Sequence, residues 1–262
     1  MIFEHGMCGS NPLHCAETEQ EVLKIIDRYG TSSMNMFGDT ALHYASSKEI
    51  AMLLIEDGAD VNCKNLMGMT PLHYAFSDEV ALTLILNGAE VNSKSSMGVT
   101  PLHMSMEIKT SRVLIEHGAD VNIRSNCGET PLHMAPTISI IQLLVDNGAD
   151  IETKDLIGMT PLMNSCYCMN AGIFGSGRII KRFIELGADV NSTNNTGNGL
   201  KEIMGDKYPF IEKLQCERTR RELVSLRNLY KRKNHLWEEG NICNQLITHN
   251  SDDIFRNIVG FI

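Results

Sequence analysis

The chain has 262 residues, a formal net charge of −9 at pH 7 and a pI near 5.5. This acidic balance argues against nucleic acid as the main partner, because phosphate binding needs a basic face. No apolar run approaches the roughly 20 residues of a membrane span, and residues 1–5 carry neither the basic nor the apolar region of a secretory signal. We therefore expect a soluble protein in the cytoplasm.

Two short motifs recur at an interval of 30 residues. The first is Thr, then Pro or Ala, then Leu and usually His, and it begins at Thr40, Thr70, Thr100, Thr130 and Thr160. The second is Gly-Ala-Asp or Gly-Ala-Glu, and it begins at Gly58, Gly88, Gly118 and Gly148, with a later copy at Gly187. A weaker copy of the first motif, Asn11 to His14, precedes them. Self-similarity at a fixed period of this length is typical of a repeat solenoid.

The first motif predicts a helix start. In the repeat at residues 68–98, Thr70 is expected to cap the helix by accepting a backbone N–H, and Pro71 suits the first helical position. Leu72 and Ala75 then share a buried face. We expect His73 to hydrogen bond to the Thr hydroxyl or to the backbone of the neighbouring turn, which is a structural role rather than a catalytic one.

The second motif predicts a helix end. Val80, Ala81, Leu84 and Ile85 form an apolar stripe at helical spacing, and Gly88 can adopt the left-handed conformation that ends a helix. The polar connector that follows is too short for a third helix, so we expect a protruding β-turn or hairpin.

Taken together, Gly-x-Thr-Pro-Leu-His and Gly-Ala-Asp-Val-Asn resemble the ankyrin repeat. The resemblance implies an all-α solenoid of helix pairs with β-hairpin or turn fingers, over residues 1–199. It covers about six repeats, of which the first is degenerate. These repeats have 30 residues instead of the usual 33. The missing three fall between the two helices, for example at residues 46–48, so that edge should be trimmed by about one helical turn.

The sixth repeat carries an insertion near residues 169–177. It contains Gly172, Gly175 and Gly177, and we expect a loop between the two helices. A phosphate-binding role is disfavoured, because no strand precedes the glycines and no Gly-Lys-Ser or Gly-Lys-Thr follows them.

Residues 200–262 are expected to form a capping repeat and a helical tail. The segments 200–204 and 210–214 look like the two helices of a decayed repeat. Residues 218–237 predict a separate basic amphipathic helix, whose charges suit a solvated face or, alternatively, a nuclear signal.

The last residues carry a second resemblance. Ile254, Ile258, Phe261 and Ile262 form an apolar stripe at helical spacing. With Asp253 they resemble the latter part of the F-box-like (PRANC) segment that ends many poxvirus ankyrin proteins, although its Leu-Pro pair is absent. The resemblance implies binding to the Skp1 subunit of a cullin ubiquitin ligase. The alternative is that this helix caps the solenoid.

The ankyrin resemblance also implies a partner surface on the concave face and the fingers. The residues that follow the motif histidines are Tyr44, Tyr74, Met104 and Met134, with Asn164 at the matching position of the last copy. Residues before the motif threonines are Met69, Val99 and Met159. Apolar residues at the finger tips are Leu66, Met67 and Met97, with Leu156 and Ile157 further on. For Met67, Met97 and Ile157, packing of finger against finger is an equal alternative. Met and aromatic side chains are favoured at adaptable interfaces.

No nucleophile–base pair, carboxylate pair or metal cluster emerges, so we expect no enzyme, cofactor or metal. The eight cysteines show no paired spacing and predict free thiols. Cys166 and Cys168 could form half of a metal site, but no second half lies nearby. The expected function is a monomeric protein-binding module: a viral adaptor that links a host target to the ligase, or alternatively a scaffold or sequestering inhibitor with no ligase link. The nucleus is an alternative location, and the target stays open.

Overall fold

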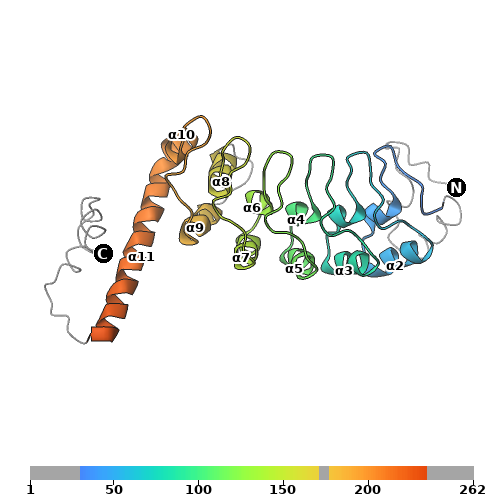
Figure 1. Cartoon of the computed structure of the whole chain (residues 1–262), viewed down its shortest axis with the longest axis horizontal. Helices are drawn as coiled ribbons and strands as arrows, with labels where there is room; N and C mark the ends of the chain where they lie inside the picture. The colour runs from blue at the N-terminus through green and yellow to red at the C-terminus, as the bar shows by residue number, and fades with distance from the viewer. Residues whose placement is uncertain (1–29, 171–176, 235–262) are drawn as a thin grey trace, which may run out of the picture.

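The chain folds into a row of stacked helix pairs. The computed structural model describes the backbone of residues 30–170 and 177–234. Figure 1 shows loops, here called fingers, that project to one side of the row, with a short inner helix beside each finger and a longer outer helix beyond it. The inner helices are η2 (Ala41–Tyr44), η3 (Pro71–Tyr74), α4 (Pro101–Met104), α6 (Pro131–Met134) and α8 (Pro161–Asn170). The outer helices are α2 (Lys48–Glu56), α3 (Asp78–Leu86), α5 (Ile108–Glu116), α7 (Ile138–Asp146) and α9 (Gly177–Glu185).

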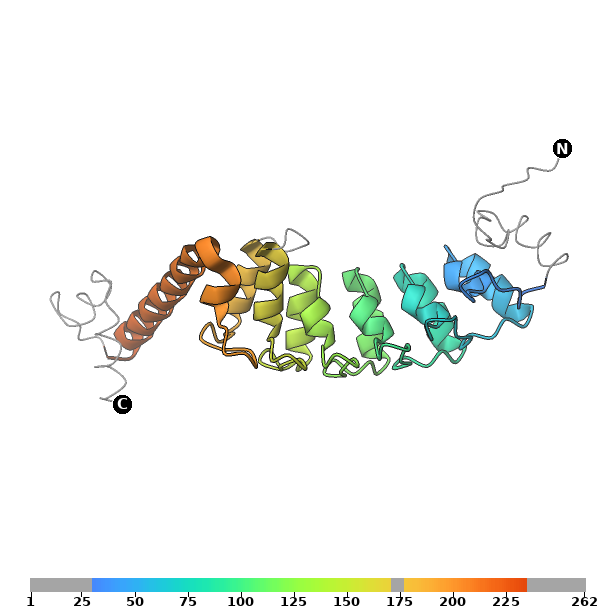
Figure 2. The same ribbon diagram turned by 90° about the horizontal axis from the view of Figure 1, so that it is seen from above.

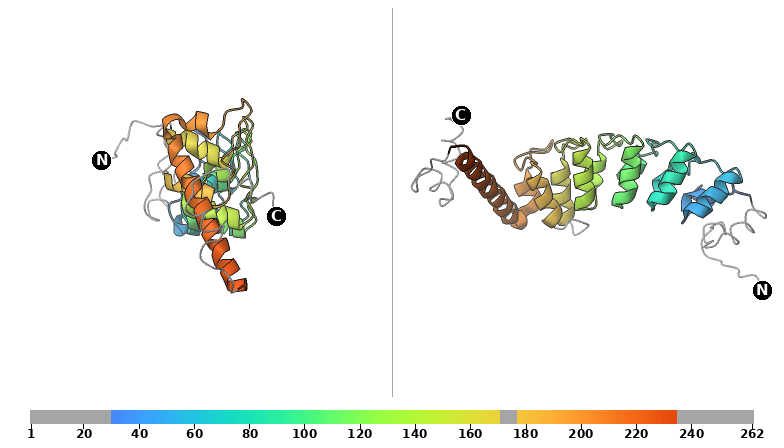
Figure 3. Two further views of the ribbon diagram at one scale, coloured as in Figure 1. Left: turned by 90° about the vertical axis from the view of Figure 1, so that its left-hand side faces the viewer. Right: turned by 90° about the horizontal axis from the view of Figure 1, so that it is seen from below.

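The described part of the chain contains no β-strand, which confirms the all-α class. The fingers are turns rather than hairpins. Figure 2 shows them lining one long side of the row. The end-on view on the left of Figure 3 shows the last helix, α11, lying across the end of the stack.

The inner helices before α8 are single turns of four residues. Each starts after an extended Thr and stops when the backbone becomes extended again, at Ala45, Ala75, Ser105 and Ala135. Three residues then lead to the outer helix. This is the trimmed edge that the repeat length predicted. Pro136 follows Ala135, the residue after α6, and cannot continue the helix.

The Thr–His pair adds imidazole hydrogen bonds to the cap that we expected. The Thr70 hydroxyl lies 2.9 Å from Nδ1 of His73, and the Thr70 backbone N–H donates to the same nitrogen at 3.0 Å. A backbone N–H can only donate, so Nδ1 is the acceptor and Nε2 carries the proton. Nε2 donates to the carbonyl oxygen of Val99, in the next repeat, at 3.0 Å. The same links recur at His43, His103 and His133.

In the last copy of the motif, the helix cap at Thr160 lacks an imidazole. Met163 stands in place of His, and there the Thr160 hydroxyl does accept the backbone N–H of Met163, at 3.3 Å. Where a His is present, its imidazole is a further partner of the Thr hydroxyl, and Thr and His together form a capping box.

The outer helices follow the expected start and stop rules. Ser47, Ser77 and Thr137 cap α2, α3 and α7 by accepting backbone N–H groups. After the helices, Gly58 and Gly88 adopt φ values of 90° and 92°, which confirms their left-handed conformation. One Leu from each of α2, α3, α5 and α7 is almost completely buried in the core: Leu54, Leu84, Leu114 and Leu144.

The fingers are stacked through their backbones. Asn65 Oδ1 accepts the N–H groups of Met67 and Met69, both at 2.9 Å, and so closes the turn at the tip. Leu66 N–H donates to the Phe37 carbonyl at 3.0 Å, and Ser96 N–H donates to the Met67 carbonyl at 2.8 Å. Neighbouring fingers are thus held in register by backbone hydrogen bonds, to which the Asn126 side chain adds a bond to the Ser96 carbonyl oxygen at 2.9 Å.

The insertion lies between α8 and α9, as predicted, but its bounds differ. Met169 and Asn170 are helical, at the end of an α8 that has ten residues instead of four. Gly177 is the first residue of α9. No Pro or Gly interrupts the sequence from Leu162 to Asn170, so the helix continues past the point where the other inner helices stop.

The C-terminal part contains α10 (Leu200–Met204), η4 (Gly205–Lys207) and α11 (Tyr208–Asn234). Leu200, Met204, Ile211 and Leu214 join the same core as the repeats. The predicted break between residues 214 and 218 was wrong, because α11 is continuous and contains no Gly or Pro after Pro209. None of the helices in the described ranges has the length and apolar character for a membrane crossing.

Candidate protein-binding surface

The residues after the motif histidines lie in a row, because consecutive inner helices pack on one another from η2 to α8. Tyr44 and Met134 are exposed, while Tyr74 and Met104 are half-buried. The row of apolar side chains therefore crosses four repeats. Asn164 ends it with a polar group, and its Nδ2 donates to the His133 carbonyl oxygen at 3.0 Å.

A buried carboxylate fixes the N-terminal end of this row. Asp39 accepts hydrogen bonds from Tyr44 Oη at 2.8 Å, Asn65 Nδ2 at 2.7 Å and Asn35 Nδ2 at 3.1 Å. Burial alone would raise the pKa of Asp39, but these three hydrogen bonds hold it below its ordinary value. The carboxylate is therefore ionised at neutral pH and keeps Tyr44 in one orientation.

The two tyrosines are ordered together. Their ring centroids lie 6.0 Å apart, and the Tyr74 hydroxyl accepts a hydrogen bond from Asn65 Nδ2 at 3.2 Å. Burial and the bond to Asp39 raise the pKa of Tyr44 to about 12. Such pre-ordered aromatic side chains lose little conformational entropy when a partner binds.

Two strongly exposed residues at the trimmed edge were missed by the sequence reasoning. Phe76 is 73% exposed and Met106 is 68% exposed, each two residues beyond the row described above. The 30-residue register could have found them, since they occupy equivalent positions. The matching residues in the flanking repeats are Ser46 and Pro136. We call Tyr44, Tyr74, Phe76, Met104, Met106 and Met134 the inner band.

The finger tips expose a second apolar set. Leu66 is 77% exposed, and Met67, Met97, Leu156 and Ile157 are also exposed. These side chains stay exposed although neighbouring fingers are joined by backbone hydrogen bonds. Apolar side chains gathered on a surface are typical of interaction sites.

The family comparison agrees with this architecture. A family model described as Ankyrin repeats (3 copies) matches residues 13–95 and 76–155, which together span more than half of the chain. The chain belongs to the ankyrin repeat family. A comparison with curated proteins found no match. Ankyrin repeats are protein–protein interaction modules, so the inner band and the finger tips are the surfaces to consider for a partner.

Not every predicted contact residue of this ankyrin surface is available. Val99 is 9% exposed and Met159 is 6% exposed, so the expectation that a partner contacts them was wrong. Met69 is half-buried. All three carbonyl oxygens accept the Nε2 hydrogen of a motif histidine in the preceding repeat. These hydrogen bonds place the residue before each of these Thr residues at the contact between two repeats.

The motif histidines and Cys166 are buried within the repeats. No three His, Cys, Asp or Glu side chains gather there to hold a metal ion. Cys166 is buried, and burial raises the pKa of its thiol to about 12, so it stays a neutral thiol. Burial lowers the pKa of His103 to about 4, so its imidazole stays neutral and holds the structure together.

The predicted F-box-like residues, Ile254, Ile258, Phe261 and Ile262, lie outside the described residues, as does the degenerate first repeat. The described surface is therefore that of the ankyrin repeats and the first part of α11.

Proposed function

We propose that the chain is a substrate adaptor. In this proposal the inner band and finger tips hold a host target protein, and residues 250–262 recruit the Skp1 subunit of a cullin ubiquitin ligase. The observation that carries the target-binding half is the inner band, a series of Met and aromatic side chains that continues across four repeats. The proposed site of action is the host cytoplasm, with the nucleus as the alternative.

The inner band suits a protein target for physical reasons. Phe76 and Met106 are largely exposed, so covering them would remove apolar area from water at about 25 cal/mol per Å². Tyr44 and Tyr74 are already ordered by the Asp39 network. Such a combination of rigid aromatic and adaptable Met contacts favours a large protein surface over a small ligand.

The ligase half of the proposal is supported by sequence alone. Asp253, Ile254, Ile258, Phe261 and Ile262 match the spacing of the F-box-like segment of poxvirus ankyrin proteins. The Leu-Pro pair of that segment is missing, and Asn250 and Ser251 stand in its place. The viral origin of the chain is part of the same proposal.

The alternative function is a scaffold or sequestering inhibitor of a host protein with no ligase link. It shares the target surface and differs only in the role of the last helix, which would then cap the solenoid. The test of the target surface and the test of the ligase link are therefore separate.

The target surface is tested by a double substitution, Phe76→Asp with Met106→Asp. Both side chains are exposed, so the variant should fold, and we expect capture of an identified host protein to fall at least about tenfold, since the apolar contacts at an interface centre dominate its affinity. Leu86→Asp is the matched control, because Leu86 is 71% exposed on outer helix α3. Equal capture by the double variant and the control would contradict the assignment of the inner band.

The ligase link is tested by co-precipitation of recombinant Skp1. The full chain should recover Skp1, while a chain ending at Asn250 and an Ile258→Asp variant should not. Arg256→Ala is the control, since Arg256 lies outside the apolar stripe. Equal recovery by the full and the shortened chain, or recovery by neither, would remove the adaptor function and leave the scaffold.

A further inference from the structure

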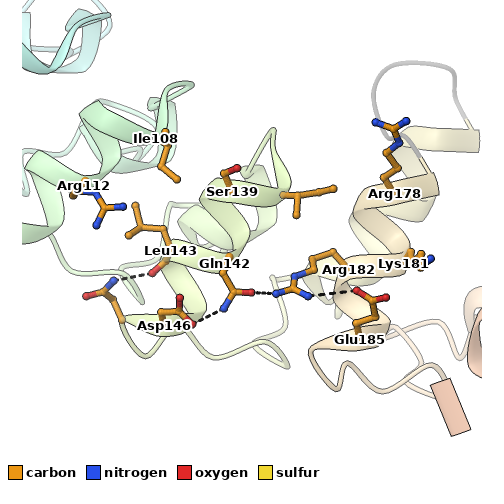
Figure 4. A pocket seen from close by; sticks show the side chains of 12 residues that line it. Ile108, Arg112, Ser139, Gln142, Leu143, Asp146, Arg178, Lys181, Arg182 and Glu185 are labelled. Atoms are coloured by element: carbon orange, nitrogen blue, oxygen red, sulfur yellow. Dashed lines mark hydrogen bonds and ion pairs between the residues drawn. The ribbon is translucent and has the colours of Figure 1, made fainter. Parts of the chain in front are cut away.

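A groove of about 730 Å³ crosses the outer helices α5, α7 and α9. Figure 4 shows Arg112 reaching from α5 on one side of α7, and Arg178 and Lys181 on α9 on the other side. Figure 1 shows that these outer helices lie on the side of the row away from the fingers. The groove is therefore separate from both surfaces proposed for the target.

The groove is positively charged although the whole chain is acidic. Arg112, Arg178 and Lys181 form no ion pair with any described residue. Arg182 instead donates to Gln142 and pairs with Glu185 at 3.4 Å. The cations that remain without a carboxylate thus flank the groove on two sides.

The groove also has apolar lining. Ile138 is 37% exposed, Ile108 is half-buried, and Leu143 is buried beneath them. Gln142 lies between the two sides and holds the Arg182 side chain. An occupant that used the whole groove would need an apolar group near α7 and anionic groups on both sides of it.

This charge is not a general property of the repeats. The positions equivalent to Arg112 in α3 and α2 hold Leu82 and Met52. The positions equivalent to Lys109, one residue into α5, hold Glu79 and Glu49. At these positions the outer face changes from acidic and apolar in α2 and α3 to basic in α5 and α9. Stacking of the repeats alone does not require this change.

We propose that this groove binds an acidic peptide segment of a second protein. Carboxylates of the segment pair with Arg112 on one side and with Arg178 and Lys181 on the other, and an apolar side chain between them packs on Ile138. A nucleic acid fits less well, because its phosphate backbone needs a continuous basic face, whereas the cations of this groove are separated by the apolar side chains of Ile108 and Ile138. The proposal gives the chain a second binding site that does not depend on the inner band or on Skp1.

The test measures binding of a fluorescein-labelled peptide of Glu and Asp residues with Leu near its centre, using fluorescence anisotropy and the full chain. Substituting Arg112→Glu together with Lys181→Glu should weaken binding at least about tenfold, since it turns two attractions into repulsions. Lys48→Glu with Lys201→Glu is the matched control, because both lysines are exposed and the change in net charge is the same. The control should bind within about twofold of the unchanged chain.

The apolar part of the site has its own variants. Ile138→Ser, or a peptide with Ser in place of Leu, should weaken binding several-fold. Circular dichroism and thermal unfolding establish that each variant is folded. Three outcomes would each overturn the proposal. The two charge-reversed variants could lose binding equally, removal of the Leu could have no effect, or a single-stranded RNA could bind more tightly than the peptide.

Discussion

The motif histidine is the residue on which the joints between repeats depend. Its Nδ1 accepts the N–H of the Thr three residues earlier, and its Nε2 donates to a carbonyl 26 residues later. The bond to Nδ1 requires the neutral imidazole with its proton on Nε2, because a protonated Nδ1 cannot accept. Protonation would place a second N–H against the Thr amide, and that contact is repulsive.

The stability of the repeats should therefore depend on pH. Burial lowers the pKa of His103 from 6.5 to about 4, and it lowers the pKa of His73 and His133 as well. Between pH 4 and pH 6.5 the histidines of the unfolded chain bind protons that those of the native chain do not, so the free energy of unfolding rises with pH in this range. The stabilisation is complete above about pH 6.5 and is lost as the pH falls through about 4.

Urea unfolding at several pH values measures this dependence. Substituting His103→Met should lower the stability at pH 7 by about 1–3 kcal/mol, because the Glu129 carbonyl and the Thr100 N–H lose their partners. The free energy of unfolding should also depend less steeply on pH between 4 and 6.5, because unfolding of the variant takes up about one proton fewer. An unchanged slope would show that His103 does not carry the effect.

At the scale of the single element, the finger depends on a glycine that faces the next finger. Gly68 has a φ of +71°, and a Cβ on it would lie 2.8 Å from the Ser96 backbone nitrogen. Gly88 has a φ of +92°, but a Cβ there would meet nothing within 4 Å. The two glycines share the need for a positive φ and differ in the space around them.

This difference predicts unequal costs for the same substitution. Gly68→Ala should destabilise the chain more than Gly88→Ala, by about 1–3 kcal/mol, because only the first forces two fingers apart. Thermal and urea unfolding of the two variants give the comparison directly. Equal destabilisation would mean that the fingers separate at little cost.

Much of this element structure could be predicted from the sequence, because the repeat aligns equivalent residues. Thr70, Pro71 and Gly88 mark the starts and ends of helices by local chemistry alone, and the missing three residues located the trimmed edge. The length of α11 could not be predicted in this way, since a decayed repeat loses the Gly and Thr signals that mark a boundary.

The candidate surface was harder to predict than the elements. The 30-residue register assigns Tyr74 and Val99 each to a set of residues that recurs in every repeat, but it does not give the direction of a side chain. Val99 is buried at the contact between two repeats, where its carbonyl oxygen accepts a hydrogen bond from His73. The basic groove was missed because Arg112 and Lys181 come from repeats that are not adjacent, and the insertion within the sixth repeat interrupts the 30-residue register between them. Their proximity depends on how α5, α7 and α9 stack.

At the scale of the whole molecule, the helices of residues 30–170 and 177–234 pack mainly on those of neighbouring repeats, as expected for a solenoid. The core continues from Ala41 to Leu214 as a single cluster. A local defect should therefore weaken the joints on either side of it without changing the repeats further away.

A substitution in the middle of the row tests this expectation. Leu114→Ala in α5 should cost about 2–5 kcal/mol, since Leu114 is almost completely buried and the cavity cannot close fully. It should also broaden the urea transition or split it in two, because the two halves of the row then unfold separately. Leu82→Ala, at a partly exposed position of α3, is the control and should keep a single transition.

The replacement of His by Met163 has a consequence for how the row responds to acid. Four imidazole links tie consecutive repeats from His43 to the Met159 carbonyl, and in the described ranges no such link continues beyond Met163. Lys154 and Asn195 donate to carbonyl oxygens across that last junction, as Lys94 and Asn126 do across earlier ones. A drop in pH that loosens the earlier junctions would leave this one intact, so the chain should come apart from its amino-terminal side while the end that carries α11 stays assembled.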